Sequence, residues 1–165
     1  MSALSCNKLT KTFTQGSQTI KGLDDVSIAI AEGSFVCLSG PSGSGKTTLL
    51  NAMGGLDTPD SGEILVGDMR VDQMNKSDLA DMRLHNIGFV FQSYNLIPVL
   101  TAQENIEFVM QIQGIPADQR SAKSREILAE VGLADHEGRR PAQLSGGQQQ
   151  RVAVARAIVS NPTLV

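Results

Sequence analysis

Residues 40–48 combine the residue types that bind phosphate. The run reads Gly40, Pro41, Ser42, Gly43, Ser44, Gly45, Lys46, Thr47 and Thr48. Glycines adopt positive φ easily and have no Cβ that would keep an anion away from the backbone N–H groups. A lysine adds a mobile positive charge, and a threonine hydroxyl is a typical Mg²⁺ ligand in such loops. The chemistry predicted here is the binding of a nucleotide phosphate with its magnesium ion.

The segments on either side of this loop support that interpretation. Residues 34–39 form a short apolar run, which predicts a buried strand, and residues 48–53 predict a helix. A strand, a glycine-rich turn and a helix N-terminus together aim N–H groups and the helix dipole at one anion. Lys46 is then expected to reach the β- and γ-phosphates, and Thr47 to bind Mg²⁺. The alternative is a glycine-rich turn with a surface lysine, which this context disfavours.

A second motif, residues 144–148 (Leu-Ser-Gly-Gly-Gln), begins 98 residues after Thr47 when counted to Ser145. Ser145 is predicted to cap a helix that runs from about Gln148 to Val159. Exposed amides at Gly146 and Gly147 would make a second anion site. A single γ-phosphate does not need two helix N-termini from one chain, so this site is expected to face a nucleotide held by another subunit. Taken alone, the motif is equally compatible with an ordinary cap and turn.

The elements that must position these residues fall into a strand-rich part and a helical part. In the helical part, Thr101 and Glu104 have the spacing of a capping box, and Gly114 is expected to end that helix. The remaining predicted elements are strands at Ala3–Cys6, Val26–Ile30 and Asn86–Phe91, a hairpin of Glu63–Val66 with Met69–Val71, and a helix at Ala122–Glu130. Arg151 and Arg156 on the last helix are expected to be structural anchors.

Composition excludes several classes of function. The chain has 165 residues, 41% of them hydrophobic, and a net charge of −3, which gives no general attraction to nucleic acid. No apolar run approaches the roughly 20 residues that span a bilayer, and there is no signal-peptide core, so a cytoplasmic location is expected. Two cysteines, Cys6 and Cys37, are too few for a disulfide framework, and Cys37 is predicted to be buried.

Together, residues 40–48, Phe91-Gln92 and residues 144–151 resemble the nucleotide-binding subunit of ATP-binding cassette (ABC) transporters. The similarity runs from about residue 4 to the last residue. It implies an α/β fold of the P-loop NTPase type with an N-terminal antiparallel β subdomain and an inserted α-helical subdomain. The expected division is residues 1–92 for the β subdomain and P-loop core, 93–145 for the helical subdomain, and 146–165 for the signature helix and the start of the next strand.

The resemblance also implies roles for individual residues. Phe13 is placed where the family stacks an aromatic ring on adenine, although packing at a strand end is an alternative. Gln92 corresponds to a glutamine that contacts Mg²⁺ and its water, while Lys46 contacts the phosphates. Residues 145–148 correspond to the signature that contacts the nucleotide of the partner subunit. The segment that follows Gln92 corresponds to the place where the family receives its membrane subunit. Its apolar residues could equally belong to the helical core: Tyr94, Leu96, Pro98 and Leu100.

The cofactors implied are ATP and Mg²⁺, and the implied partners are a second copy of the subunit and a transmembrane permease at the inner face of the cell membrane. Residues 91–105 are similar to the bacterial branch that releases lipoproteins or exports macrolides. In the family, an apolar strand followed by Asp-Glu comes after the signature helix; here Asn161-Pro162-Thr163-Leu164-Val165 ends the sequence without these carboxylates. The expectation is therefore a truncated subunit that binds ATP without hydrolysing it. A nucleic-acid or ribosome-associated cassette, which would show a long inserted coil or a second cassette, and a genuinely non-hydrolysing binding module are the rival classes.

Overall fold

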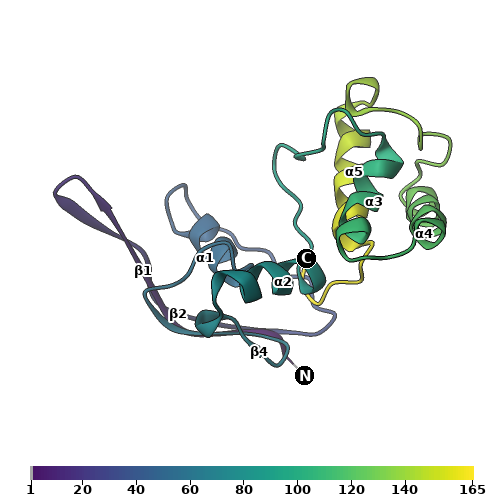
Figure 1. Cartoon of the computed structure of the whole chain (residues 1–165). Coiled ribbons are helices and arrows are strands. Elements are labelled where there is room, and N and C mark those ends of the chain that lie inside the picture. The colour runs from purple at the N-terminus through teal and green to yellow at the C-terminus, as the bar shows by residue number, and fades with distance from the viewer. Residues whose placement is uncertain (1) are drawn as a thin grey trace. The chain divides into compact units, whose positions relative to one another are not determined.

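The computed structural model of the chain describes residues 2–165, apart from the side chain of Gln15. It contains two compact units. One comprises the residues up to Arg83 together with Leu164, and the other comprises residues 84–163 together with Val165. Figure 1 shows the strands and α1 in the first unit and the α3, α4 and α5 helices in the second. Each unit is described separately below.

The first unit is built on an antiparallel sheet in the order β2-β1-β3-β4. Strand β1 (Ser2–Gln15) pairs with β2 (Gln18–Ala31) across a turn at Gly16, which has φ 62°. The other edge of β1 pairs with β3 (Ser61–Val66), which forms a hairpin with β4 (Met69–Arg70). The predicted strands at residues 3–6 and 26–30 and the hairpin at residues 63–71 are confirmed. Strands β1 and β2 are longer than expected because each strand continues past its apolar centre into polar residues.

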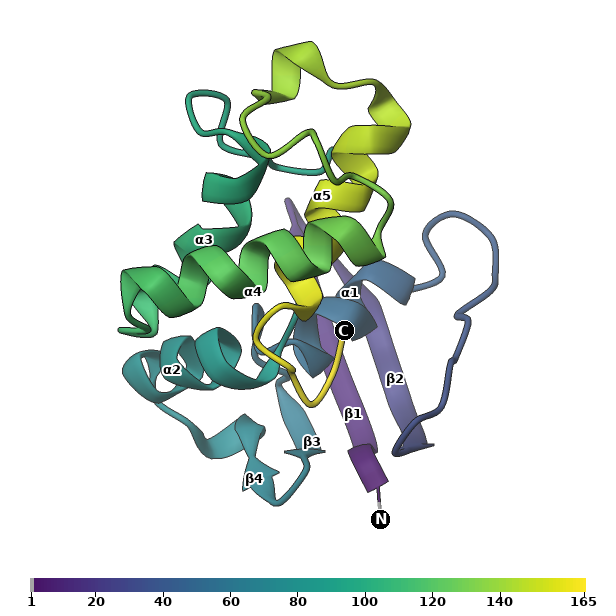
Figure 2. The ribbon, with the colours of Figure 1, turned by 90° about the vertical axis from the view of Figure 1, so that its right-hand side faces the viewer.

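Helix α1 (Lys46–Met53) packs against β1 and β2, as Figure 2 shows. A short 3-10 turn, η1 (Val71–Gln73), leads into α2 (Lys76–Asn86). The sequence analysis did not predict α2. Only Met82 is buried on this helix, so its sequence has no apolar stripe at helical spacing. Helix α2 is fixed locally, since Met82 lies against Gly55 and Arg83 Nη1 donates to the Gly55 carbonyl over 2.7 Å.

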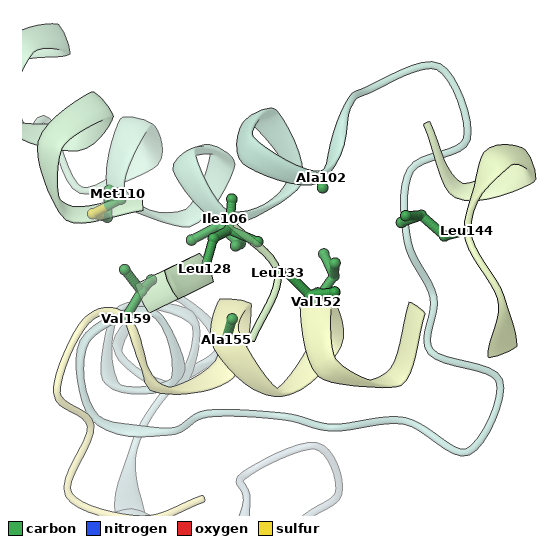
Figure 3. Packing of buried hydrophobic residues seen from close by; sticks show 9 residues of the cluster. All are labelled: Ala102, Ile106, Met110, Leu128, Leu133, Leu144, Val152, Ala155 and Val159. Carbon is green, nitrogen blue, oxygen red and sulfur yellow. The ribbon is translucent and has the colours of Figure 1, made fainter. Parts of the chain in front are cut away.

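The second unit is a helical subdomain. It contains α3 (Ala102–Ile112), α4 (Ala117–Glu130), the 3-10 turn η2 (Pro141–Gln143) and α5 (Gly146–Ile158). Buried side chains from all three α-helices and their connections form its core (Figure 3): Ala102, Ile106, Met110, Leu128, Leu133, Leu144, Val152, Ala155 and Val159. Burying nine apolar side chains between three helices is what holds α5, and therefore the signature motif, in place.

The predicted helices of this unit are confirmed with shifted boundaries. The capping box of Thr101 and Glu104 is present at the start of α3. Helix α4 begins at Ala117, directly after Pro116, instead of at the predicted Ala122. The prediction missed the first turn of this helix because that turn is polar and has no apolar periodicity. Helix α5 begins at Gly146, two residues before the expected Gln148, with Ser145 as its N-cap.

Two predicted core strands are wrong for this structure. Residues 34–39 form an irregular segment, seen in Figure 2 as part of the long loop between β2 and α1, in which Phe35 is 99% exposed. Cys37, predicted to be buried, is exposed. Residues 86–91 contain a single bridge residue, Ile87, and Asn86 ends α2. An apolar run forms a strand only when neighbouring strands accept its backbone hydrogen bonds, and within residues 2–165 neither run has a ladder of such neighbours.

Candidate functional site

The loop before α1 has the backbone conformation that its glycines were predicted to supply. Gly43 has φ 80° and Gly45 has φ 86°, both in the left-handed region that side chains disfavour. Around Gly43 the space is open, whereas a Cβ on Gly45 would collide with the backbone carbonyl oxygen of Gly22. The loop therefore passes directly against β2 at Gly45 and is open toward solvent at Gly43.

Lys46 folds its side chain back over this loop. Its Nζ donates to the carbonyl oxygens of Gly40 (2.8 Å) and Pro41 (2.7 Å) and lies 3.3 Å from Ser44 Oγ. In the part of the chain that the structure describes, no carboxylate forms an ion pair with Lys46. A positive charge held by neutral carbonyl groups is not neutralised, so it remains available to an anion.

The start of α1 also leaves backbone donors available. No side chain caps this helix and no acidic residue lies in its first turn. Among residues 2–165, no hydrogen-bond acceptor is found for the N–H groups of Lys46, Thr47 and Thr48, while Leu49 N donates to the Gly45 carbonyl. Free N–H groups, the helix dipole and Lys46 point to the same chemistry, because each stabilises negative charge. The residues present therefore fit a phosphate group.

Phe13 lies next to this loop. Its ring, 42% exposed, covers Gly22, where an added Cβ would meet Phe13 Cε2 at 2.5 Å and Thr48 Cγ2 at 3.3 Å. Lys11 Nζ lies 5.8 Å from the ring centroid. The structure thus brings an exposed aromatic ring next to the last residue of the phosphate loop, in the first unit of the chain. The absence of a side chain at Gly22 is what permits this approach.

Gln92 is exposed and lies in a turn of the second unit. Directly after it, Tyr94 and Asn95 adopt φ values of 60° and 47°, which are unfavourable for residues other than glycine. Arg156 of α5 holds this turn by donating from Nη2 to the Tyr94 carbonyl over 2.8 Å and from Nη1 to the Asn95 carbonyl over 2.7 Å. Burial lowers the pKa of Arg156. Two charge-assisted bonds therefore connect the signature helix to the segment that follows Gln92.

The other predicted anchor, Arg151, donates from Nη1 to the carbonyl oxygens of Val131 (3.0 Å) and Gly132 (3.3 Å) at the end of α4. Both arginines therefore bind backbone carbonyls on other elements of the helical subdomain, as a structural anchor does.

The signature motif forms a complete capping box. Ser145 Oγ accepts from the Gln148 N–H over 3.3 Å, and Gln148 Oε1 accepts from the Ser145 N–H over 2.8 Å. Gly146 and Gly147 are exposed at the first turn of α5, and no acidic residue lies in that turn. A Cβ on Gly147 would have no neighbour within 4 Å. Ser145 is thus the N-cap that the sequence predicted, and the first turn of α5 is exposed at Gly146 and Gly147.

The apolar residues after Gln92 divide between the core and the surface. Leu96 packs against the helical core, whereas Pro98 and Val99 are exposed, Val99 to 72%. Tyr94 and Leu100 are partly buried. The segment is fixed by the fully buried Asn105 of α3, whose Oδ1 accepts from Ile97 N over 2.7 Å while its Nδ2 bonds the carbonyls of Ile97, Leu100 and Thr101. Leu96 is therefore a core residue, whereas Pro98 and Val99 are exposed to solvent.

The structure brings the predicted site residues together in two groups. Phe13 and residues 40–48 lie together in the first unit, and the Gln92 segment and residues 145–148 lie on or against α5 in the second. Sequence reasoning missed Gly22 and the amide of Asn105. A buried asparagine in an apolar helix could have been noticed as a backbone-binding residue, but Gly22 carries no signal until the neighbouring strand is placed.

The described residues contain no group of three or more His, Cys, Asp or Glu side chains that could hold a metal ion. Among residues 2–165, no helix combines the length and apolar character needed to cross a membrane.

Comparisons with known proteins place the chain in a family. The ABC transporter family matches residues 23–165. An uncharacterised ABC transporter ATP-binding protein of Thermotoga maritima is 48% identical over 155 residues, which cover 94% of this chain and 66% of that protein. The macrolide export ATP-binding/permease protein MacB of Neisseria gonorrhoeae is 39% identical over 165 residues, covering 100% of this chain and 26% of that protein.

Solved structures agree with this assignment. The dimeric post-hydrolysis state of the ATP-binding cassette MJ0796, bound to ADP and Pi, matches with a TM-score of 0.88 and 41% sequence identity. That match covers 96% of this chain and 70% of the solved chain. The present chain thus spans about two thirds of the first relative and about a quarter of MacB. With this match to the family and this fold, the chain belongs to the ABC transporter family and carries its ATP-binding domain.

Proposed function

We propose that this chain binds ATP as part of the motor subunit of a membrane transporter of the macrolide-export and lipoprotein-release type. The observation that carries the proposal is the start of α1, where unbonded N–H groups and the unpaired charge of Lys46 meet in an open loop. The identity of 39% to MacB over the whole chain supports the branch.

Within one subunit, the loop residues divide the work of holding the nucleotide. The N–H groups of residues 43–48 and the Lys46 ammonium bind the β- and γ-phosphates, and Phe13 stacks on the adenine. By the family resemblance, the Thr47 hydroxyl and the Gln92 amide are the groups that would hold Mg²⁺. When bound, Mg²⁺ neutralises phosphate charge, and it commonly takes only one or two protein oxygens besides the phosphates.

Across the dimer, Ser145, Gly146, Gly147 and Gln148 bind the γ-phosphate held by the partner subunit. The exposed start of α5 supports this role, because the backbone N–H groups of a first helical turn can bind an anion there as they can at the start of α1. The cassette MJ0796 was solved as a dimer with ADP and Pi. Two copies of this chain are proposed to close around two ATP molecules and to reopen when the γ-phosphate contacts are lost.

The partner membrane subunit is proposed to dock on the segment after Gln92, where Pro98 and Val99 are exposed. Since α5 holds this segment through Arg156, closure at the signature would move the docking segment with it. The domain is proposed to lie in the cytoplasm, peripheral to the inner face of the membrane, and the three-part division at residues 92 and 145 stays a prediction.

Binding is tested with a fluorescent ATP analogue and the Lys46→Ala variant. Loss of the ammonium removes charge-assisted bonds to phosphate, each contributing about 1.5–3 kcal/mol, so affinity is expected to fall roughly ten- to a hundredfold. The matched control is Lys21→Ala, an exposed lysine of β2 that pairs with Asp24 over 2.9 Å. Equal affinity in the Lys46 variant and the wild-type chain would refute the assignment of the loop.

A further inference from the structure

The capping box at the start of α5 continues into a third side chain. Gln148 Nε2 lies 3.0 Å from His136 Nε2, and His136 Nδ1 lies 3.2 Å from the Ala134 carbonyl oxygen. His136 is partly buried, as is Gln148. A row of hydrogen bonds therefore runs from the Ala134 carbonyl through the imidazole and the Gln148 amide to Ser145.

The directions of these hydrogen bonds follow from one fixed point, the Ser145 N–H. A backbone N–H can only donate, so the Gln148 atom 2.8 Å from it is the carbonyl oxygen Oε1. The other amide atom is then Nε2, a donor, and the His136 Nε2 that faces it must accept. The proton of the neutral imidazole consequently lies on Nδ1 and is donated to the Ala134 carbonyl. Each assignment requires the next.

The segment that carries His136 is itself fixed to the helical subdomain. Leu133 is fully buried in the core. The carbonyl oxygens of Glu137 and Arg139 accept from the N–H groups of Gln103 (3.1 Å) and Ala102 (2.7 Å) at the start of α3. His136 is thus held between the N-termini of two helices, which makes its ring a fixed acceptor for the Gln148 amide.

We propose that His136 is a positioning residue for the signature motif, acting through Gln148 on Ser145. By accepting from Nε2 it keeps the amide oxygen of Gln148 on the Ser145 N–H. The Ser145 oxygen accepts from the Gln148 N–H, which leaves its hydroxyl proton free to donate to an anion. The consequence for nucleotide binding rests on the proposed function, whereas the hydrogen-bond relay itself does not.

The relay requires a neutral imidazole. A protonated ring presents N–H groups at both nitrogens, so two donors would face each other between His136 and Gln148, and this contact must break.

The test uses amide hydrogen exchange of the 165-residue chain, followed by NMR and corrected for intrinsic exchange rates. His136→Leu removes the acceptor, so the Ser145 amide is expected to exchange about fivefold faster, as for the loss of one ordinary hydrogen bond. His136→Gln places an amide oxygen near the position of Nε2 and is expected to restore the wild-type rate.

A Ser145 exchange rate unchanged in His136→Leu would overturn the proposal. So would a His136→Gln variant that behaves as His136→Leu does. ATP binding, measured on the same samples, distinguishes the two levels of inference. Failure of the wild-type chain to bind ATP would contradict the proposed function, yet the exchange results would still decide whether His136 positions the capping box.

Discussion

Replacing Arg156 with methionine is expected to release the turn that follows Gln92. Methionine keeps the aliphatic length of the side chain and removes the guanidinium, so both bonds to the Tyr94 and Asn95 carbonyls are lost. Bonds from a charged donor contribute about 1.5–3 kcal/mol each. Part of this is offset, because burial disfavours the charge and lowers the pKa of Arg156. The net loss of unfolding free energy is expected to be about 2–4 kcal/mol.

The backbone of the turn explains why these bonds matter locally. Tyr94 and Asn95 both have positive φ, a conformation that costs roughly 1–2 kcal/mol for a residue with a Cβ. The two bonds from the charged Arg156 side chain to the carbonyls of these residues offset that strain. The turn should therefore relax before the rest of the helical subdomain unfolds, and Gln92 should lose its fixed position relative to α5.

The sequence offers a convenient assay, since Tyr94 is the single tyrosine and the chain contains no tryptophan. Tyrosine fluorescence reports the turn, and far-ultraviolet circular dichroism reports the helices during urea unfolding. In Arg156→Met the fluorescence transition should move to lower urea than the circular dichroism transition. Arg156→Lys keeps one charged donor, so its fluorescence transition should lie between those of the wild type and Arg156→Met. The control, Arg125→Met, changes an exposed arginine of α4 and should stay within about 0.5 kcal/mol. Wild-type stability and coincident transitions in Arg156→Met would refute the reasoning.

Three further predictions concern the loop, the thiols and a helix cap. Gly45→Ala should lower thermal stability and weaken ATP binding, because its φ of 86° and its contact with β2 exclude a Cβ; an unchanged melting temperature would contradict this. Cys37 should react with iodoacetamide at pH 8 while Cys6 does not, because burial raises the pKa of Cys6 to about 11; mass spectrometry showing equal labelling would contradict it. Hydrogen bonds from Thr101 lower the pKa of Glu104. The ionised carboxylate therefore stabilises α3 at pH values above the ordinary carboxyl pKa, and this stabilisation is lost as the pH falls through the lowered pKa of Glu104. Glu104→Gln should flatten that acid-side loss, and an identical pH profile of unfolding would argue against the cap.

Local signals in the sequence predicted most of the fold. The hairpin at residues 63–71, the capping box at Thr101 and the N-cap at Ser145 each depend on residues close to one another in the sequence. The strands predicted at residues 34–39 and 86–91 are absent from the structure. A core strand depends on partner strands distant in sequence, which a local pattern does not reveal. Helix α2 was missed for the opposite reason, since one buried methionine gives no periodic pattern.

For the candidate site, motif spacing predicted which helix starts carry the proposed phosphate-binding residues, but not which contacts support those residues. Lys46 and residues 145–148 stand at the helix starts where the motifs require them. The contacts that fix them come from residues without a motif, such as Gly22 beneath Phe13 and His136 beside Gln148. A side chain that acts through one hydrogen bond across 12 residues leaves no pattern in composition or periodicity.

The most direct test of the central claim is the set of backbone amide signals that move when ATP and Mg²⁺ are added to the isotope-labelled chain. Binding at the start of α1 predicts the largest NMR shift changes at the N–H groups of residues 43–48, with smaller changes around the Phe13 ring. In Lys46→Ala, the same addition should produce little change. Large shifts confined to other segments, with residues 43–48 unmoved, would contradict the assignment of this loop as the nucleotide site.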